Sequence, residues 1–155
     1  MSVLIRQATV QDLADVLQLY AQPAMDNGQV LSLPQAEQQF AQFSLYPNYR
    51  LFVACKAQSD APASAGRVVG TYALLVMHNL AHQGTPSAIV EDVVVSAERQ
   101  SQGIGRAMMA SAMDLAREAG CYKLVLSSNQ KRERAHAFYE SLGFQRHGFS
   151  FQIEI

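Results

Sequence analysis

Two glycines, Gly103 and Gly105, stand between an apolar stretch and a segment whose apolar residues have helical spacing. Glycine lets the backbone turn tightly, so the N–H groups of such a loop can converge on one point, where a pyrophosphate can bind. The loop is not a Walker A loop, because no Lys-Ser or Lys-Thr follows Gly105, and it lacks the third glycine of the dinucleotide fingerprint. The two glycines alone fit a tight turn without a ligand equally well, so the flanking residues must decide.

Two adjacent carboxylates, Glu91 and Asp92, interrupt the apolar run from Ala88 to Val95. A run this apolar predicts a central strand of a sheet. Because successive side chains of a strand point to opposite faces, we expect only one of the two carboxylates to meet a substrate. The other should then be held by a structural partner.

The cysteines and histidines show no metal-ligand spacing, so no metal site is predicted. Cys121 stands at the start of an expected strand and is better explained as a small core residue than as a nucleophile that accepts an acyl group. The basic run of Lys131, Arg132 and Arg134 is typical of a solvated helix start. Alternatively, these side chains could bind a phosphate group.

Two helices are expected in the N-terminal half. Thr9 with Asp12, and Ser32 with Gln35, resemble the N-terminal caps of helices, the second of which should cover residues 34–45. Strands are expected over residues 3–5, 51–57 and 68–77, with a hairpin loop over residues 59–66. The strands over residues 51–57 and 68–77 should form an antiparallel pair.

The C-terminal half should alternate strands and helices. A strand over residues 88–95 precedes a helix that ends at Gly120, and a strand over residues 122–127 precedes a helix that ends at Gly143. Residues 144–155 should form a final hairpin or pair of strands. The strand-helix-strand order predicts a right-handed crossover, and therefore an α/β fold with a mixed sheet.

Composition points to one domain over residues 1–155. The 155 residues are 49% hydrophobic and 16% charged, which suits one sizeable core. The formal net charge is −1, too weak a field to hold nucleic acid or an anionic membrane. No apolar stretch approaches the roughly 20 residues of a membrane helix, and the N-terminus lacks the regions of a signal peptide. We therefore expect a cytoplasmic protein.

Two motifs together resemble a known superfamily. The sequence from Gln100 to Gly105 reads Gln-x-x-Gly-x-Gly, which resembles the acyl-CoA pyrophosphate loop of the GNAT acetyltransferases. The segment from Ala135 to Phe144, with Tyr139 and a terminal Gly-Phe, resembles their last helix. The resemblance is strong over residues 88–145 and is most similar to glucosamine-6-phosphate and aminoalkylphosphonate N-acetyltransferases. It implies the GNAT fold, in which about four helices flank a central mixed sheet, and acetyl-CoA as cosubstrate.

The resemblance also implies where acetyl-CoA binds. Main-chain groups of the central strand should pair with the pantetheine arm like an added strand, and the glycine loop should wrap the pyrophosphate. The superfamily often carries an Asn at the position of Arg132, and Asn129 is its substitute here. The expected cofactor contacts are Val93, Val94, Val95, Ser101, Gln102, Gly103, Ile104, Gly105, Arg106, Asn129 and Phe138.

Three groups carry the chemistry that the resemblance implies. The Val93 N–H would stabilise the oxyanion, the Tyr139 hydroxyl would protonate the departing thiolate, and Glu91 would take a proton from the incoming ammonium. Asp92 and a chain of waters stay open as alternative bases. A tyrosine on an apolar helix face is usually a core residue, but the place of Tyr139 five residues before Phe144 favours the catalytic role.

The expected function is acetylation of the primary amine of a small molecule, by direct transfer in a ternary complex. Two other classes stay open. A protein or peptide N-acetyltransferase would need an open groove, and a non-catalytic acyl-CoA sensor would keep the glycine loop without needing Tyr139 and Glu91. No motif identifies the amine, and a homodimer is held as an open expectation.

Overall fold

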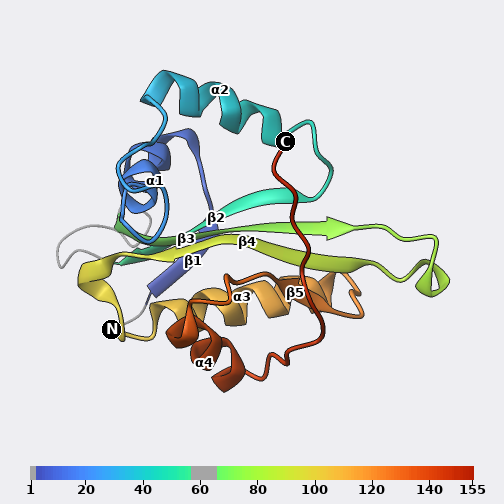
Figure 1. Ribbon diagram of the computed structural model, residues 1–155. Helices are drawn as coiled ribbons and strands as arrows, with labels where there is room; N and C mark the ends of the chain where they lie inside the picture. The colour runs from blue at the N-terminus through green and yellow to red at the C-terminus, as the bar shows by residue number, and fades with distance from the viewer. Residues whose placement is uncertain (1–2, 57–65) are drawn as a thin grey trace. The chain divides into compact units, whose positions relative to one another are not determined.

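The computed structural model describes residues 3–56 and 66–155, in two compact units that meet after Val125 (Figure 1). The predicted loop over residues 59–66 falls almost entirely outside the described residues. The elements of the first unit are β1 (Val3–Gln7), η1 (Val10–Asp12), α1 (Leu13–Tyr20), α2 (Leu33–Phe43), β2 (Tyr49–Lys56), β3 (Arg67–Met77), η3 (His82–Gly84), β4 (Ser87–Val95), η4 (Ala97–Arg99) and α3 (Ile104–Glu118). A short strand, β5 (Leu124–Leu126), leads into the second unit, which contains α4 (Glu133–Ser141).

The five strands form one sheet in the order β1-β2-β3-β4-β5. The pairs β1–β2, β2–β3 and β3–β4 are antiparallel. Along β4 and β5, the Tyr122 N–H donates to the Pro86 carbonyl and the Ala88 N–H donates to the Lys123 carbonyl, each at 3.0 Å. Residue numbers rise together in these two bonds, so β5 runs parallel to β4. The sheet is mixed, which confirms the predicted fold class.

The start of α1 shows how short-range chemistry sets an element. The Asp12 carboxylate accepts from the Thr9 N–H at 2.7 Å, as expected of an N-terminal cap. Both Asp12 oxygens also accept from the Arg6 guanidinium at 2.7 Å, which ties β1 to the helix start. Asp12 is buried, and its hydrogen bonds to Arg6 lower the pKa of the carboxyl below its ordinary value.

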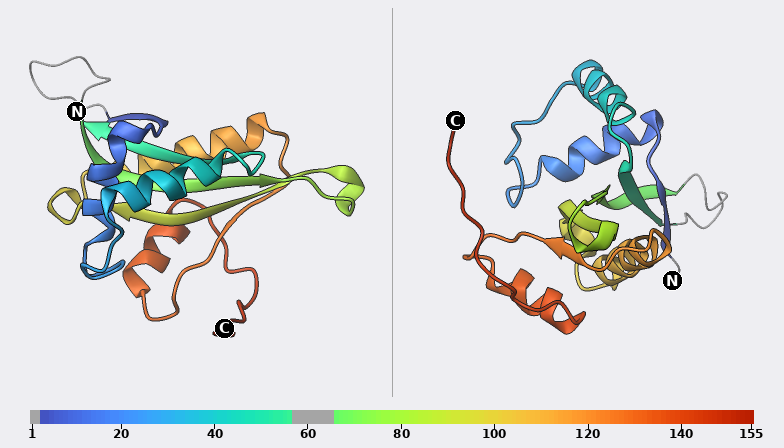
Figure 2. Two further views of the ribbon diagram at one scale, coloured as in Figure 1. Left: turned by 90° about the horizontal axis from the view of Figure 1, so that it is seen from above. Right: turned by 90° about the vertical axis from the view of Figure 1, so that its right-hand side faces the viewer.

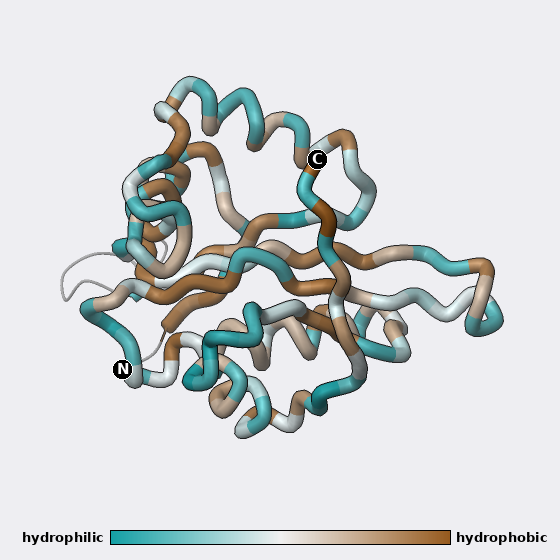
Figure 3. Tube along the Cα trace, viewed as in Figure 1, coloured by the Kyte–Doolittle hydropathy of each residue, from teal (hydrophilic) through white to brown (hydrophobic). Residues whose placement is uncertain are grey.

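Within the first unit, α1 and α2 lie over one face of the sheet and α3 over the other (Figure 1). Figure 3 shows hydrophobic residues concentrated along the strands. The hairpin between β3 and β4, with η3 at its tip, extends beyond the helices (Figure 2). The buried residues between the sheet and α1 and α2 include Leu13, Val16, Leu19, Ala36, Leu51, Val53, Cys55, Val68, Ala73 and Val94.

A glycine on β3 lets α3 approach the sheet closely. A Cβ added to Gly70 would lie 2.6 Å from Met108 Sδ and 3.3 Å from Ile104 Cγ2. Both partners are on the first turns of α3 and are fully buried. This contact fixes the position at which α3 begins, and with it the preceding loop.

The second unit, residues 126–155, contains α4 and a C-terminal segment without regular structure. Gly143 follows α4 with φ +94, a conformation that favours glycine after a helix. The predicted hairpin or strand pair over residues 144–155 is wrong. Phe149, Phe151 and Ile153 alternate as in a strand, but they are 92%, 94% and 82% exposed. The alternation alone does not make a strand, because a strand also needs a neighbouring backbone to pair with.

Among the described helices, none combines the length and the apolar character that crossing a membrane requires.

Candidate active site

The central strand β4 carries a bulge at the two carboxylates. The register pairs Ala73 of β3 with Glu91 and Thr71 with Val94, so Asp92 and Val93 together stand opposite a single residue of β3. Asp92 takes φ +51, which accommodates the extra residue. The bulge interrupts the ladder, and such interruptions re-aim the side chains and main-chain groups next to active sites.

The direction of the β4 backbone beyond the bulge follows from one hydrogen bond. The Ser96 N–H donates to the Val69 carbonyl of β3 at 2.8 Å. Because backbone polar groups of a strand alternate between its two sides, those of Val95 and Val93 point away from β3. A ligand lying along that side of β4 would therefore contact main-chain groups of Val93 and Val95, two of the expected cofactor contacts. The Val94 side chain is buried in the core, and by the same alternation its main-chain groups point toward β3.

Both carboxylates of the bulge act electrostatically on the same tyrosine, Tyr49. The charges of Asp92 and Glu91, with desolvation as the larger cause, raise the pKa of Tyr49 above its ordinary value. The expectation that Glu91 and Asp92 point to opposite faces assumes a regular strand, and the bulge interrupts that regularity at Asp92.

The electrostatics of this pair suit proton transfer. Partial desolvation, and then the charge of Asp92, raise the pKa of Glu91. Partial desolvation, and then the charge of Asp26, raise the pKa of Asp92. Both side chains nevertheless reach solvent. A carboxylate with a raised pKa is a better proton acceptor near neutral pH than an ordinary one, and nearby negative charge attracts a cationic amine.

The glycine loop between β4 and α3 makes two left-handed turns of the backbone. Ser101 has φ +63 and Gly103 has φ +79, and no atom lies within 4 Å of the position of a Cβ on Gly103. Gly103 is the N-cap of α3 and offers no side chain to the helix start. The N–H groups of the first turn, which starts with Ile104, Gly105 and Arg106, lack partners within the helix and are available to an anion.

The residues of the loop divide into two roles. Ser101, Gln102 and Arg106 have exposed side chains, whereas the Ile104 side chain is 2% exposed and anchors α3 in the core. Ile104 can therefore contribute only its backbone to a ligand. Exposed polar side chains around a fixed helix start suit the binding of a charged group.

Sequence reasoning missed Gln22, which connects α1 to the end of β4. Its side-chain oxygen accepts from the Ala97 N–H at 2.6 Å, and its side-chain nitrogen donates to the Leu19 carbonyl at 2.9 Å and the Val95 carbonyl at 3.4 Å. Gln22 thus holds the chain where it leaves β4 toward the glycine loop. The contact spans more than 70 positions, and no local motif could have indicated it.

The second unit holds Tyr139 and Phe138 on α4. The ring of Tyr139 packs 5.2 Å from that of Phe138 and 5.8 Å from that of Phe144, between ring centroids. Burial raises the pKa of the Tyr139 hydroxyl, and the charge of Arg132 opposes this. The hydroxyl is therefore protonated at neutral pH, the state that a general acid requires.

Asn129, the nominated substitute contact, is engaged locally. Its side-chain oxygen accepts from the Lys131 N–H at 2.9 Å, and its carbonyl accepts from the Arg132 N–H at 2.9 Å. Only the side-chain NH₂ group is left for a ligand, so Asn129 mainly shapes the start of α4.

Neither a metal nor a cysteine nucleophile has structural support. Within residues 3–56 and 66–155, no three His, Cys, Asp or Glu side chains are placed to hold a metal ion. Desolvation raises the pKa of the Cys121 thiol, which lowers the fraction of reactive thiolate.

The fold and these features define an acyltransferase of the GNAT type: a mixed sheet with a bulged central strand, followed by a glycine loop at the start of a helix. The chain belongs to the acetyltransferase (GNAT) family, whose sequence profile matches residues 13–144.

Similar proteins agree with this assignment. The glucosamine 6-phosphate N-acetyltransferase of Trypanosoma brucei brucei is 32% identical over 90 residues, which are 58% of this chain and 59% of the relative. The aminoalkylphosphonate N-acetyltransferase of Salmonella typhimurium is 38% identical over 86 residues, 56% of this chain and 55% of the relative. These alignments span little more than half the length of either relative. The crystal structure of a Trypanosoma brucei acetyltransferase shares the fold, with a TM-score of 0.83, 24% identity and coverage of 99% of this chain and 100% of that one.

Proposed function

We propose that this protein transfers the acetyl group of acetyl-CoA to the primary amine of a small molecule, directly and in a ternary complex. The bulge of β4 is the observation that carries the proposal. It places Glu91, with its raised pKa, two residues from the Val93 N–H, which points away from β3. A proton acceptor next to an oxyanion donor is what acyl transfer to an amine requires.

The residues around this bulge fit acetyl-CoA. The open space beside Gly103 and the free N–H groups at the start of α3 suit the pyrophosphate, and the main-chain groups of Val93 and the Val95 N–H suit the pantetheine arm. Bound acetyl-CoA supplies the acetyl group as a thioester.

The chain's own residues then move two protons and hold one charge. Glu91 takes a proton from the substrate ammonium, directly or through water, so that the neutral amine can attack the carbonyl carbon. The Val93 N–H donates to the carbonyl oxygen while the C–N bond forms and the C–S bond breaks. Tyr139 gives its hydroxyl proton to the departing sulfur, and the proton that the nitrogen loses as it becomes an amide returns to Tyr139 through solvent. Direct transfer needs no covalent enzyme intermediate, in keeping with the raised pKa of Cys121.

The class of substrate rests on the relatives. The two matched proteins are named for amino sugar phosphates and aminoalkylphosphonates, both small primary amines. We extend this to a small-molecule amine for the present chain, which we take to act as a single domain in the cytoplasm and, as a further hypothesis, as a homodimer.

An amine panel tests this function. Thiol release from acetyl-CoA is followed with amino sugars, aminophosphonates, amino acids and polyamines, and the acetylated amine is identified by mass spectrometry. We expect amine-dependent release with at least one small amine. Release only with peptides would favour a protein acetyltransferase, and CoA binding without any amine-dependent release would favour a sensor.

A further inference from the structure

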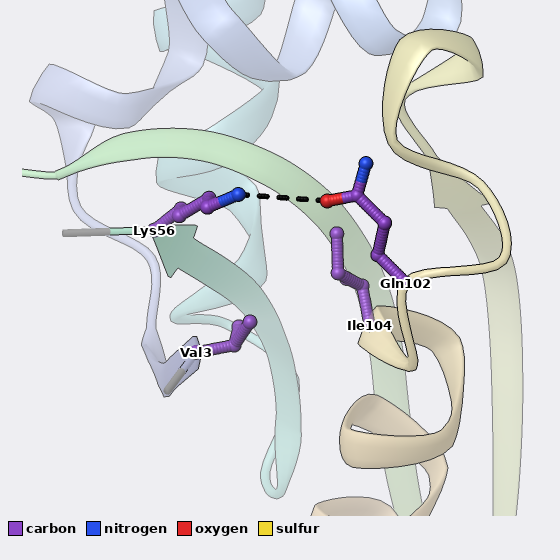
Figure 4. Close-up of a pocket in the computed structure, with 4 residues that line it drawn as sticks. All are labelled: Val3, Lys56, Gln102 and Ile104. Carbon is purple, nitrogen blue, oxygen red and sulfur yellow. Dashed lines mark hydrogen bonds between the residues drawn. The ribbon is translucent and has the colours of Figure 1, made fainter. Parts of the chain in front are cut away.

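A cavity of about 220 Å³ opens beside the glycine loop, at the end of the sheet where β2 stops. The described residues that line it are Val3, Lys56, Gln102 and Ile104, from β1, β2, the loop and α3 (Figure 4). The Lys56 ammonium donates to the Gln102 side-chain oxygen at 3.5 Å, and Figure 4 shows the two side chains pointing toward each other across the cavity. Lys56 is the last residue of β2, so its side chain reaches the loop from the sheet.

A second cation lies next to Lys56. The register of β2 and β3 pairs Lys56 directly with Arg67, and paired residues of antiparallel strands project from the same face. Like charges placed in this way repel each other. Within the described residues, the ion pairs are Arg6 with Asp12, Arg117 with Asp114 and Arg146 with Glu140, so no described carboxylate neutralises Lys56 or Arg67.

The start of α3 adds to this positive potential. This helix of 15 residues begins at Ile104, next to the cavity, and carries no acidic residue in its first turn. Its uncapped N–H groups attract anions. The Lys56 ammonium and the main-chain donors at the start of α3 thus border one open space, and an anionic ligand there would satisfy both.

The opposite faces of the sheet separate this space from the amine. Cys55 belongs to the core on the α1 side, so Lys56, the next residue, projects toward the α3 side. Ala73, which pairs with Glu91, belongs to the core on the α1 side. An anion beside Lys56 therefore lies on the face of the sheet away from Glu91. The amine must reach Glu91, so an anion at this place fits a part of the cofactor and not a part of the amine.

We propose that Lys56, supported by Arg67, binds a phosphate group of CoA and is thus an additional cofactor-binding residue of the proposed acetyltransferase, on whose function this inference rests. The Gln102 oxygen holds the ammonium beside the loop in the free protein. When CoA binds, the ammonium forms a charge-assisted hydrogen bond to the phosphate oxygen.

Calorimetric titration of CoA tests the proposal. We expect Lys56→Gln to weaken CoA binding by roughly 5- to 20-fold, in line with the loss of one partly exposed charge-assisted hydrogen bond. Lys56→Arg should keep most of the affinity. Lys123→Gln is the matched control, because it removes one lysine charge beyond the other end of α3, about 22 Å of helix away. Melting temperatures without ligand show whether each variant is folded.

Two further ligands show whether Lys56 contacts a phosphate of CoA or only supports the glycine loop. Pantetheine, which lacks phosphates, should bind the parent and Lys56→Gln equally, and the salt dependence of CoA binding should be weaker in the variant. If 3′-dephospho-CoA still shows the loss, Lys56 binds the pyrophosphate; if the loss disappears, it binds the 3′-phosphate.

Unchanged CoA affinity in Lys56→Gln, or an equal loss for pantetheine, would overturn the role of Lys56 while leaving the proposed function intact. A parent protein that binds no CoA would overturn both.

Discussion

Replacing Gly103 by alanine should weaken CoA binding through backbone strain alone. Gly103 has φ +79, and no atom lies within 4 Å of an added Cβ. The methyl group therefore meets no clash, and its cost is that of holding a side chain in the left-handed region, about 1–2 kcal/mol. Part of this strain lowers the free energy of unfolding of the variant. If the exposed loop relaxes in the free protein and so avoids the rest of the strain, that remainder reappears when CoA holds the loop in its binding conformation, and it weakens CoA binding.

Gly120 offers a matched control for this strain. It follows the other end of α3 with φ +73, and it too has no atom within 4 Å of an added Cβ. Gly120→Ala should lose about 1–2 kcal/mol of stability, which corresponds to a fall in melting temperature of roughly 2–8 °C for a chain of this size. Its CoA affinity should not change.

Thermal unfolding and calorimetric titration of both variants give the comparison. For Gly103→Ala we expect a smaller fall in melting temperature than for Gly120→Ala. Its CoA dissociation constant should rise by about 5- to 30-fold if the whole of the strain appears in binding, since 1.4 kcal/mol is a factor of ten. Gly103→Val, with a β-branched side chain that tolerates this region less, should bind CoA more weakly still. Equal CoA affinity in the parent, Gly103→Val and Gly120→Ala would refute the assignment of the pyrophosphate to this loop.

Three further substitutions test other parts of the account. Tyr139→Phe should lower turnover by roughly 10- to 10⁴-fold with unchanged CoA affinity, whereas exposed Tyr46→Phe should not; equal turnover in both, with chemistry rate-limiting, would make Tyr139 a packing residue. In the parent, the rate should rise with pH as Glu91 loses its proton, at a pKa above the ordinary value, and this rise should be absent in Glu91→Gln. The activity of Glu91→Gln should recover only at high pH, where the amine is already neutral in solution. A pH profile identical to the parent's would exclude Glu91 as the base. Asp12→Asn should cost about 1.5–3 kcal/mol of stability at neutral pH. Folding lowers the pKa of Asp12, so this stabilisation is fully present above the pKa of Asp12 in the unfolded chain and disappears as the pH falls through its pKa in the folded protein. The urea midpoints of the parent and of Asp12→Asn should therefore converge in acid.

The local parts of the fold could be predicted because short-range chemistry determines them. The Ser32 cap of α2 forms as expected, with the Gln35 N–H donating to the Ser32 hydroxyl at 3.4 Å and the Ser32 N–H donating to the Gln35 side-chain oxygen at 3.0 Å. The loop around Gly103 could be recognised for the same reason, since its turn requires glycine and lies within a few residues of the helix that it starts.

The parts that could not be predicted depend on partners distant in sequence. The bulge at Asp92 has no glycine to mark it, and its position follows from the register with β3, so the sequence could not indicate it. The Gln22 contact joins α1 to the chain after β4. The alternating residues from Phe149 onward indicate a strand, but alternation does not specify a partner for it.

Transfer of isotope from acetyl-labelled acetyl-CoA tests the central claim most directly. The protein is mixed with the labelled cosubstrate and an accepted amine, and label in the amine and in the protein is measured over a single turnover. We predict that label appears in the amine in step with thiol release, that none accumulates on the protein when amine is withheld, and that initial-rate plots for the two substrates intersect. Direct transfer at the Glu91 site would be contradicted if label accumulated on the protein in the absence of amine and then passed to the amine once it was added, and if the initial-rate lines were parallel.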